Sequence, residues 1–150
     1  MNTMLTENLK ILLATSYAFV IKAQNFHWNI EGSNFPQYHT FFDDLNNEVY
    51  ENAIDRTAEY IRTLESYTPG SIARYAELSL IPDQLKIPRA ELMFAELYSD
   101  NELIIAHLKV CYDSCEESEH YGISNFIAER IDAHNKHQWM IRSTLKTNRE

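Results

Sequence analysis

The chain has 150 residues and a formal net charge of −9, with 13 lysines and arginines against 22 aspartates and glutamates. It contains only three glycines and four prolines, too few for a many-stranded sandwich or barrel and for a collagen-like or proline-rich disordered chain. The acidic balance disfavours non-specific binding to nucleic-acid phosphates. Because no apolar run approaches the roughly 20 residues of a membrane span, the sequence predicts a soluble, cytoplasmic protein of one domain, residues 1–150.

Apolar residues at helical spacing predict two long helices in the first part of the chain. The first helix covers residues 5–29, and a short turn over residues 31–34 follows it. Pro36 lies in the first turn of the second helix, where its missing N–H costs nothing, and this helix is expected to continue to about Ser66. The inward side chains of the first helix are predicted to be Leu9, Leu12, Leu13, Val20, Ala23 and Phe26.

A long connection over residues 67–87 follows the second helix and carries a short helix from Ile72 to Leu80, capped by Ser71. About 20 residues are enough to run the length of a helix bundle, whereas turns of three to five residues only reverse the chain. The fold class is therefore predicted to be all-α, a four-helix bundle with a short extra helix in the long connection between helices two and three.

The third long helix is expected to begin at Pro88 and to continue to about Glu119. Gly122 is interpreted as the break, and Ser124 as the cap of a fourth helix that ends near Leu145. Both cysteines lie in the third helix and are expected to be small buried apolar side chains rather than a disulfide. The inward side chains of the third helix are predicted to be Leu92, Leu97, Leu103, Ile104, Leu108, Cys111 and Cys115.

Candidate metal ligands gather in the first two helices. His27 lies near the end of the first, and His39 and Asp43 in the second are four residues apart, so they share one helix face. Asp55 and Glu59 repeat that spacing further along. Two imidazoles and three carboxylates suit Fe(II) better than the soft ligands that select copper(I). On spacing alone, a solvated acidic helix face is the alternative interpretation.

The residues around these ligands resemble the signature of the Dps family, the DNA-binding proteins from starved cells that are also called miniferritins. The matching residues are FHWNIEGSNF at positions 26–35, then His39 and Asp43, and then DRTAE at positions 55–59. The similarity extends to WMIRS at positions 139–143, so it covers nearly the whole chain. It implies a ferritin-like four-helix bundle that assembles into a hollow dodecamer.

The resemblance also implies a function and a division of the ligands. Family members oxidise Fe(II) with hydrogen peroxide, often in preference to dioxygen, and store ferric mineral in the cavity, which protects against oxidative damage. Transferred by position, His27, His39 and Asp43 of one subunit face Asp55 and Glu59 of a twofold-related partner. Non-haem iron, Fe2+ and Fe3+, is then the metal, and the chain is expected to be a ferroxidase.

One spacing departs from the family pattern. The family separates the second histidine from the first residue of the Asp-x-x-x-Glu pair by fifteen residues, whereas His39 and Asp55 are sixteen apart. In a regular helix the extra residue turns the pair from about 60° to about 160° away from His39. A π-type bulge absorbs one residue, so we predict a bulge between Asp43 and Asp55. A regular helix would instead place Ile54 and Ala58 at the ligand positions and disable the site.

A second departure concerns DNA. The lysine-rich N-terminal tail of DNA-condensing members is missing, and Lys10 is the first cation of the chain. With a net charge of −9, DNA binding is expected to be weak or absent. Two alternatives to a ferroxidase stay open: a DNA-binding protective shell protein with a weak or inactive iron site, and a ferritin-like shell protein with a dead centre.

Three other features of the sequence have both a structural and a functional interpretation. Trp28 is either a core or interface aromatic or a sink for oxidising equivalents beside the first ligand. His134 and His137 have the spacing of a metal pair, but their polar neighbours favour a solvated helix face. The acidic residues on either side of Gly122 are interpreted as a solvated helix face, or, as the resemblance implies, as the region of an iron-entry pore whose lining is not identified.

Overall fold

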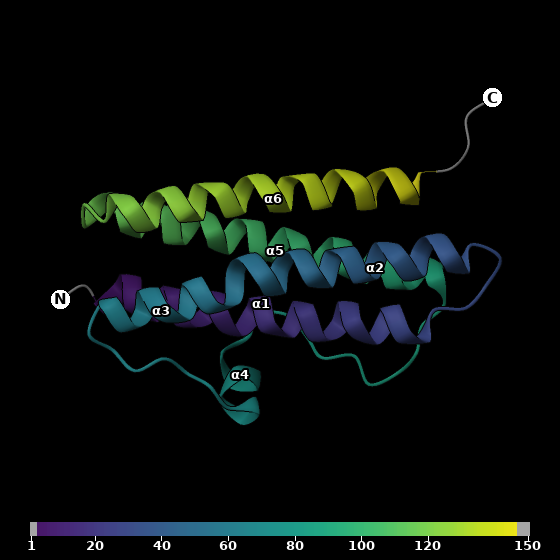
Figure 1. Ribbon diagram of the computed structural model, residues 1–150, viewed down its shortest axis with the longest axis horizontal. Coiled ribbons are helices and arrows are strands. Elements are labelled where there is room, and N and C mark those ends of the chain that lie inside the picture. Colours follow the sequence, from purple (N-terminus) through teal and green to yellow (C-terminus); the bar gives the residue numbers. More distant parts are fainter. Residues whose placement is uncertain (1–2, 147–150) are drawn as a thin grey trace.

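The structure is a computed structural model that describes residues 3–146, and all regular elements in that range are helical. Figure 1 shows α2, the π-helical segment η1 and α3 as one continuous rod, which together with α1, α5 and α6 makes four long helical units in residues 3–146. The elements are α1 (Thr3–Asn29), α2 (Phe35–Val49), η1 (Tyr50–Ile54), α3 (Asp55–Thr63), α4 (Ile72–Leu78), α5 (Ala90–Glu117) and α6 (Tyr121–Leu145).

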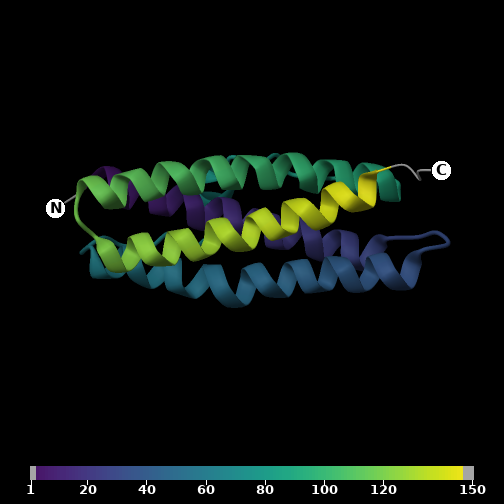
Figure 2. The ribbon, with the colours of Figure 1, turned by 90° about the horizontal axis from the view of Figure 1, so that it is seen from above.

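The four units form the predicted bundle with one crossover. The rod α2–η1–α3 runs antiparallel to α1, and α5 and α6 form a second antiparallel pair (Figures 1 and 2). The connection between α3 and α5 crosses from one end of the bundle to the other and carries α4 on its way. A connection of this length is what allows two successive long units to run in the same direction.

Aromatic side chains fill the centre of the bundle. Phe19, Phe26, Phe42, Phe94 and Phe126 are the largest fully buried side chains and come from α1, α2, α5 and α6. The ring of Phe42 lies 6.0 Å from Phe26 and 4.8 Å from Phe94, so three helices meet there. Burial of one such side chain contributes about 1.5–3 kcal/mol. All six inward residues predicted for the first helix are buried.

The predicted inward face of the third helix was partly wrong. Leu92 and Leu103 are 49% and 43% exposed, whereas Met93 and Phe94 are buried. One residue turns a helix by about 100°, so a shift of one position along the sequence exchanges an inward for an outward side chain. Leu97 and the other four predicted residues of this helix are buried.

The start of α6 also differs from the prediction. The helix begins at Tyr121 with His120 as its N-cap, so Gly122 lies inside the first turn. Glu119 adopts a left-handed conformation with φ 60° and reverses the chain at the position where a glycine is usual. Ser124 is not a cap, because its hydroxyl donates a hydrogen bond to Glu116 across the α5–α6 turn, at 2.9 Å.

The short helix in the connection forms as predicted and is fastened to the bundle. The hydroxyl of Ser71 accepts a hydrogen bond from the Arg74 N–H and caps α4, which ends at Leu78 rather than Leu80. Thr15 of α1 accepts a hydrogen bond from the backbone N–H of Leu80, at 3.0 Å. These contacts fix the path of the connection across α1.

Helix α1 is long and apolar enough to span a membrane by length and composition. More than half of that apolar stretch is buried inside the bundle, including Leu9, Leu13 and Phe19. Its hydrophobicity therefore has an explanation within the fold, as the core helix of the bundle.

Candidate metal centre

His27 and His39 form a closely fitted pair where α1 ends and α2 begins. Their rings are stacked with centroids 3.9 Å apart and planes 14° from parallel. The Nδ1 atom of each ring lies 2.6 Å from the backbone oxygen of the other residue. Because a carbonyl oxygen only accepts hydrogen bonds, each Nδ1 carries the proton and donates. In the neutral ring, Nε2 then has the lone pair that a metal ion needs.

The turn between the two helices brings these histidines together. Gly32 has a φ of 127°, which side-chain-bearing residues rarely adopt, and its carbonyl accepts a hydrogen bond from the Phe35 N–H. The ring centroids of Phe35 and His39 lie 4.8 Å apart, and the two ring planes are 20° from parallel. His39 is thus held by stacking contacts with both His27 and Phe35.

Asp43 lies one helical turn beyond His39 and close to the first histidine. Its Oδ1 atom is 3.8 Å from His27 Nε2. Two ligand atoms that each lie about 2.1 Å from one metal ion are at most about 4.2 Å apart. The observed separation therefore allows His27 and Asp43 to bind the same ion.

The π-helical segment η1 lies between Asp43 and Asp55, as predicted from the sixteen-residue spacing. Ile54 and Ala58, which a regular helix would place at the ligand positions, pack against the core instead. Asp55 and Glu59 are exposed. The bulge therefore absorbs the additional residue and leaves both carboxylates, rather than two apolar side chains, on the outer surface of the rod.

Asp55 and Glu59 interact with each other in the absence of a cation. A hydrogen bond to Asp55 and repulsion from its negative charge raise the pKa of Glu59 above its usual 4.5, with a smaller effect from burial. Two carboxylates one turn apart repel each other when both are ionised. A divalent cation bound between the two groups would relieve this repulsion, as protonation of Glu59 does.

The five predicted ligands form two groups in one subunit. Sixteen residues at 1.5 Å per residue separate His39 from Asp55 by about 24 Å along the rod. Within residues 3–146, no three histidine, cysteine, aspartate or glutamate side chains cluster in a way that could hold a metal ion. The five predicted ligands therefore lie in two separate groups of the chain and do not come together in one place.

Sequence reasoning missed a second polar region inside the bundle. His134 and His137 were interpreted as part of a solvated face, but they are 1% and 8% exposed. His137 Nε2 lies 2.6 Å from a carboxylate oxygen of Glu48, and His134 Nδ1 lies 2.7 Å from the side-chain oxygen of Asn101. The signal that could have revealed them is the polar Asn101, which interrupts the apolar stripe of α5.

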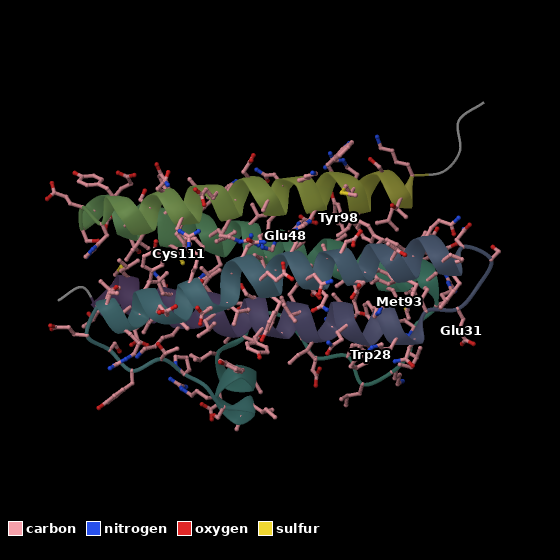
Figure 3. The ribbon with its side chains drawn as sticks, in the orientation of Figure 1. Trp28, Glu31, Glu48, Met93, Tyr98 and Cys111 are labelled. Carbon is pink, nitrogen blue, oxygen red and sulfur yellow. The ribbon has the colours of Figure 1, made fainter. Side chains whose placement is uncertain are left out.

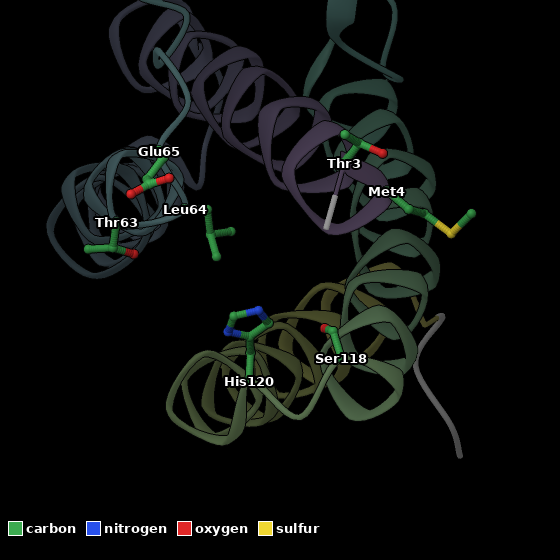
Figure 4. Close-up of a pocket in the computed structure, with 7 residues that line it drawn as sticks. All are labelled: Thr3, Met4, Thr63, Leu64, Glu65, Ser118 and His120. Carbon is green, nitrogen blue, oxygen red and sulfur yellow. The ribbon is translucent and has the colours of Figure 1, made fainter. Parts of the chain in front are cut away.

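Trp28 and the bundle end are the remaining candidate features. Trp28 is 65% exposed and is not part of the hydrophobic core of the chain (Figure 3). An open pocket of about 630 Å³ lies at the bundle end, with Leu64 and His120 among the residues around it (Figure 4). None of the five predicted ligands lines this pocket, so it is separate from the candidate centre.

Comparison with known proteins identifies the family. A family model described as a ferritin-like domain matches residues 6–150. The chain belongs to the ferritin-like family. It is 28% identical to DNA protection during starvation protein 2 of Bacillus anthracis over 145 residues, which is 97% of this chain and 99% of that protein.

A solved structure and a further relative are also similar to this chain over most of its length. The crystal structure of Dps from Staphylococcus aureus superposes with a TM-score of 0.91 at 26% identity and covers 96% of both chains. A low temperature-induced protein of Nostoc sp. is 31% identical over 136 residues, 89% of this chain and 75% of that protein. Similarity to the Dps proteins over nearly the whole length places the chain in the Dps miniferritin branch of the family, as its sequence motifs indicated.

Proposed function

We propose that this miniferritin is a ferroxidase that oxidises Fe(II) with hydrogen peroxide and stores the ferric product. Membership of the ferritin-like family supports iron storage or a protective role in general terms. The observation that carries the finer proposal is the paired arrangement of His27 and His39, in which both Nε2 lone pairs are free of the hydrogen bonds that fix the rings. Neutral imidazole and carboxylate together form a donor set suited to iron.

The complete site is proposed to form between two subunits. His27, His39 and Asp43 of one subunit would bind iron together with Asp55 and Glu59 of a twofold-related partner. Since a twofold axis repeats every contact, one such interface would contain two sites. The separation of the two ligand groups in a single chain, about 24 Å along the rod, supports this arrangement.

The proposed reaction consumes two Fe(II) ions and one hydrogen peroxide. Each Fe(II) gives up one electron, the O–O bond breaks, and two hydroxide ions form. The histidine lone pairs would bind the substrate ions, and the three carboxylates would offset the positive charge that increases as Fe(III) forms. Because both electrons come from iron in one site, no hydroxyl radical is released.

The cage is proposed to be a dodecamer, as the family resemblance implies. Large apolar side chains are exposed on the subunit, among them Tyr67, Ile72 and Leu85 of the long connection, at 84%, 87% and 90%. Contact with another subunit would remove these side chains from water. Light scattering should give about twelve times the 17.6 kDa chain mass, and a mass of one or two chains at neutral pH would contradict the proposal.

A complementation experiment tests the shared site. Each of the variants His39→Ala and Glu59→Ala should lose fast iron oxidation, because each removes one ligand from every site. If they are mixed before reassembly, about a quarter of the sites should regain a full ligand set under twofold symmetry. Activity should return to that fraction of wild type.

The control is a mixture of His39→Ala with His27→Ala. Both variants lack a ligand from the same half, so no interface between them contains a whole site, and activity should stay absent. Full activity of either His39→Ala or Glu59→Ala alone would show that the proposed ligand set is wrong. Equal failure of both mixtures would show that the site lies within one subunit.

A further inference from the structure

A buried polar network connects α2, α5 and α6 near the middle of the bundle, outside the proposed ligand set. Figure 3 places Glu48 between α2 and α6, directed into the bundle. The network ends in α2 only two residues before η1. The members of this core polar network are Glu48, Asn101, Arg130, His134, His137 and Gln138.

The hydrogen bonds of the network have a defined direction. The side-chain NH2 of Asn101 donates to the His134 backbone oxygen and to Gln138, so its side-chain oxygen faces His134 and accepts from Nδ1 at 2.7 Å. His134 Nε2 is then unprotonated and accepts from the Arg130 guanidinium at 3.1 Å. Burial and the nearby Arg130 charge both lower the pKa of His134 and keep the ring neutral.

Glu48 receives the other donors of this network. Arg130 contacts both carboxylate oxygens, at 2.6 and 2.9 Å, and His137 contacts one of them at 2.6 Å. Burial alone would raise the pKa of Glu48, but the hydrogen bonds from His137 and Arg130 outweigh it and hold the pKa well below 4.5. Glu48 therefore stays ionised, and its oxygens are occupied by donors rather than available to a metal ion.

Glu48 is also tied to the π-helical segment. The side-chain NH2 of Asn52, inside η1, donates to the Glu48 backbone oxygen at 2.9 Å and to its carboxylate at 3.2 Å. The Tyr50 N–H is shared between the carbonyls of Asn46 and Asn47, where the helical hydrogen bonding changes. A side-chain donor at this point supplements the backbone bonds that a bulge disturbs.

A second contact holds the other end of the segment. Arg56, next to Asp55, lies 3.6 Å from Glu129 and 4.4 Å above the ring of Phe126, both on α6. Glu129 precedes Arg130 in the chain, so two consecutive residues of α6 contact the rod on both sides of η1. The Arg56 contact is exposed and weak, whereas the Arg130 contact is partly buried and bidentate.

We propose that Arg130, Glu48 and Asn52 are positioning residues: they hold η1 in its bulged register, and this register sets the direction in which Asp55 and Glu59 face the iron. The inference rests on the proposed function, because it assigns these residues a role in that site. Without the register, a regular helix would turn Ile54 and Ala58 toward the ligand positions.

Asn52→Ala and Arg130→Lys test the proposal, with Asn47→Ala as the matched control. Asn52 and Asn47 are both exposed, so both alanine variants should fold, but only Asn52 bonds to Glu48. Lysine keeps the charge of Arg130 and loses the bidentate contact. Zn(II), which has no redox chemistry, serves as the probe of ligand placement.

We expect Asn52→Ala and Arg130→Lys to weaken Zn(II) binding by about tenfold, as loss of a supporting contact around a metal site commonly does. Amide hydrogen exchange should become faster over residues 50–59 in both variants. Asn47→Ala should match wild type in both measurements. Circular dichroism and light scattering should show unchanged helix content and cage size.

The proposal is overturned if Asn52→Ala equals Asn47→Ala in both Zn(II) affinity and hydrogen exchange. The Asn52 variant decides the outcome even if Arg130→Lys does not fold. A wild-type protein that binds Zn(II) but does not oxidise Fe(II) would refute the proposed function and leave this inference standing. If the wild-type protein does not bind Zn(II), the comparison of hydrogen exchange between Asn52→Ala and Asn47→Ala alone decides whether the proposal stands.

Discussion

The histidine half and the carboxylate half of the proposed centre are built in different ways. His27 and His39 are held by two reciprocal hydrogen bonds and a stack of rings, all within the turn that joins α1 to α2. Asp55 and Glu59 are exposed and interact mainly with each other, and they face outward because of the π segment before them. The first half is held by these contacts, whereas the second half combines two carboxylates that repel each other when both are ionised.

The two halves would therefore contribute differently to metal binding: one would orient the ligands and the other would attract the cation. In the proposed site the histidines would supply the geometry, since backbone oxygens hold their ring planes. The carboxylate pair would supply affinity for cations, since a bound cation would relieve the repulsion between the two groups. Under the proposal, the two halves meet only when two subunits come together.

The largest expected effect comes from breaking the rigid half. His39→Ala removes a ligand and also the partner that fixes His27, so the rate of Fe(II) oxidation by peroxide should fall by about a hundredfold. Gln37→Ala, an exposed position two residues earlier, is the control and should keep the wild-type rate. Stopped-flow absorbance of the ferric product measures both. An unchanged rate in His39→Ala would mean that the histidine pair has no part in the reaction.

A smaller effect is expected from neutralising one member of the carboxylate half. Glu59→Gln keeps the size of the side chain and removes one charge, so Zn(II) affinity should fall by about tenfold. The metal-free variant should at the same time melt slightly higher than wild type at pH 7, because the repulsion from Asp55 is gone. A lower melting temperature at pH 7 would show that the two carboxylates do not repel each other in the native state.

The pH dependence of this half follows from the raised pKa of Glu59. A group whose pKa is higher in the folded state favours folding below its unfolded value of 4.5 and loses that contribution as the pH rises through its folded value. The difference in melting temperature between Glu59→Gln and wild type should therefore become smaller as the pH is lowered from 7 to 4. Calorimetry at pH 7 and at pH 4 measures this difference. An advantage that grew toward pH 4 would contradict the assignment.

The smallest effect concerns DNA, where we expect no binding. A chain with a net charge of −9 repels phosphate, although the relative from Bacillus anthracis is named for DNA protection. A gel-shift assay with plasmid DNA at physiological salt should show no retarded band when a chelator removes bridging cations. A shift under those conditions would favour the alternative of a DNA-binding shell protein.

Much of the fold follows from local sequence patterns. The few glycines and prolines, the helical spacing of apolar residues and the long connection predicted four long helices with one crossover, and these are present. The interval between His39 and Asp55 is one residue longer than in the Dps family that the chain resembles, and this comparison predicted the bulge, because a helix has a fixed rotation per residue. The candidate ligands were found through motif resemblance and stay a prediction.

The tertiary structure decided what depends on contacts between distant segments. His134 and His137 have polar neighbours in the sequence and were assigned to the surface, but Asn101 and Glu48, distant in the chain, satisfy them in the interior. Sequence spacing fixes which side chains share a helix face, because helix geometry is local. It does not fix whether a polar face points to water or to a partner, because that partner comes from another helix.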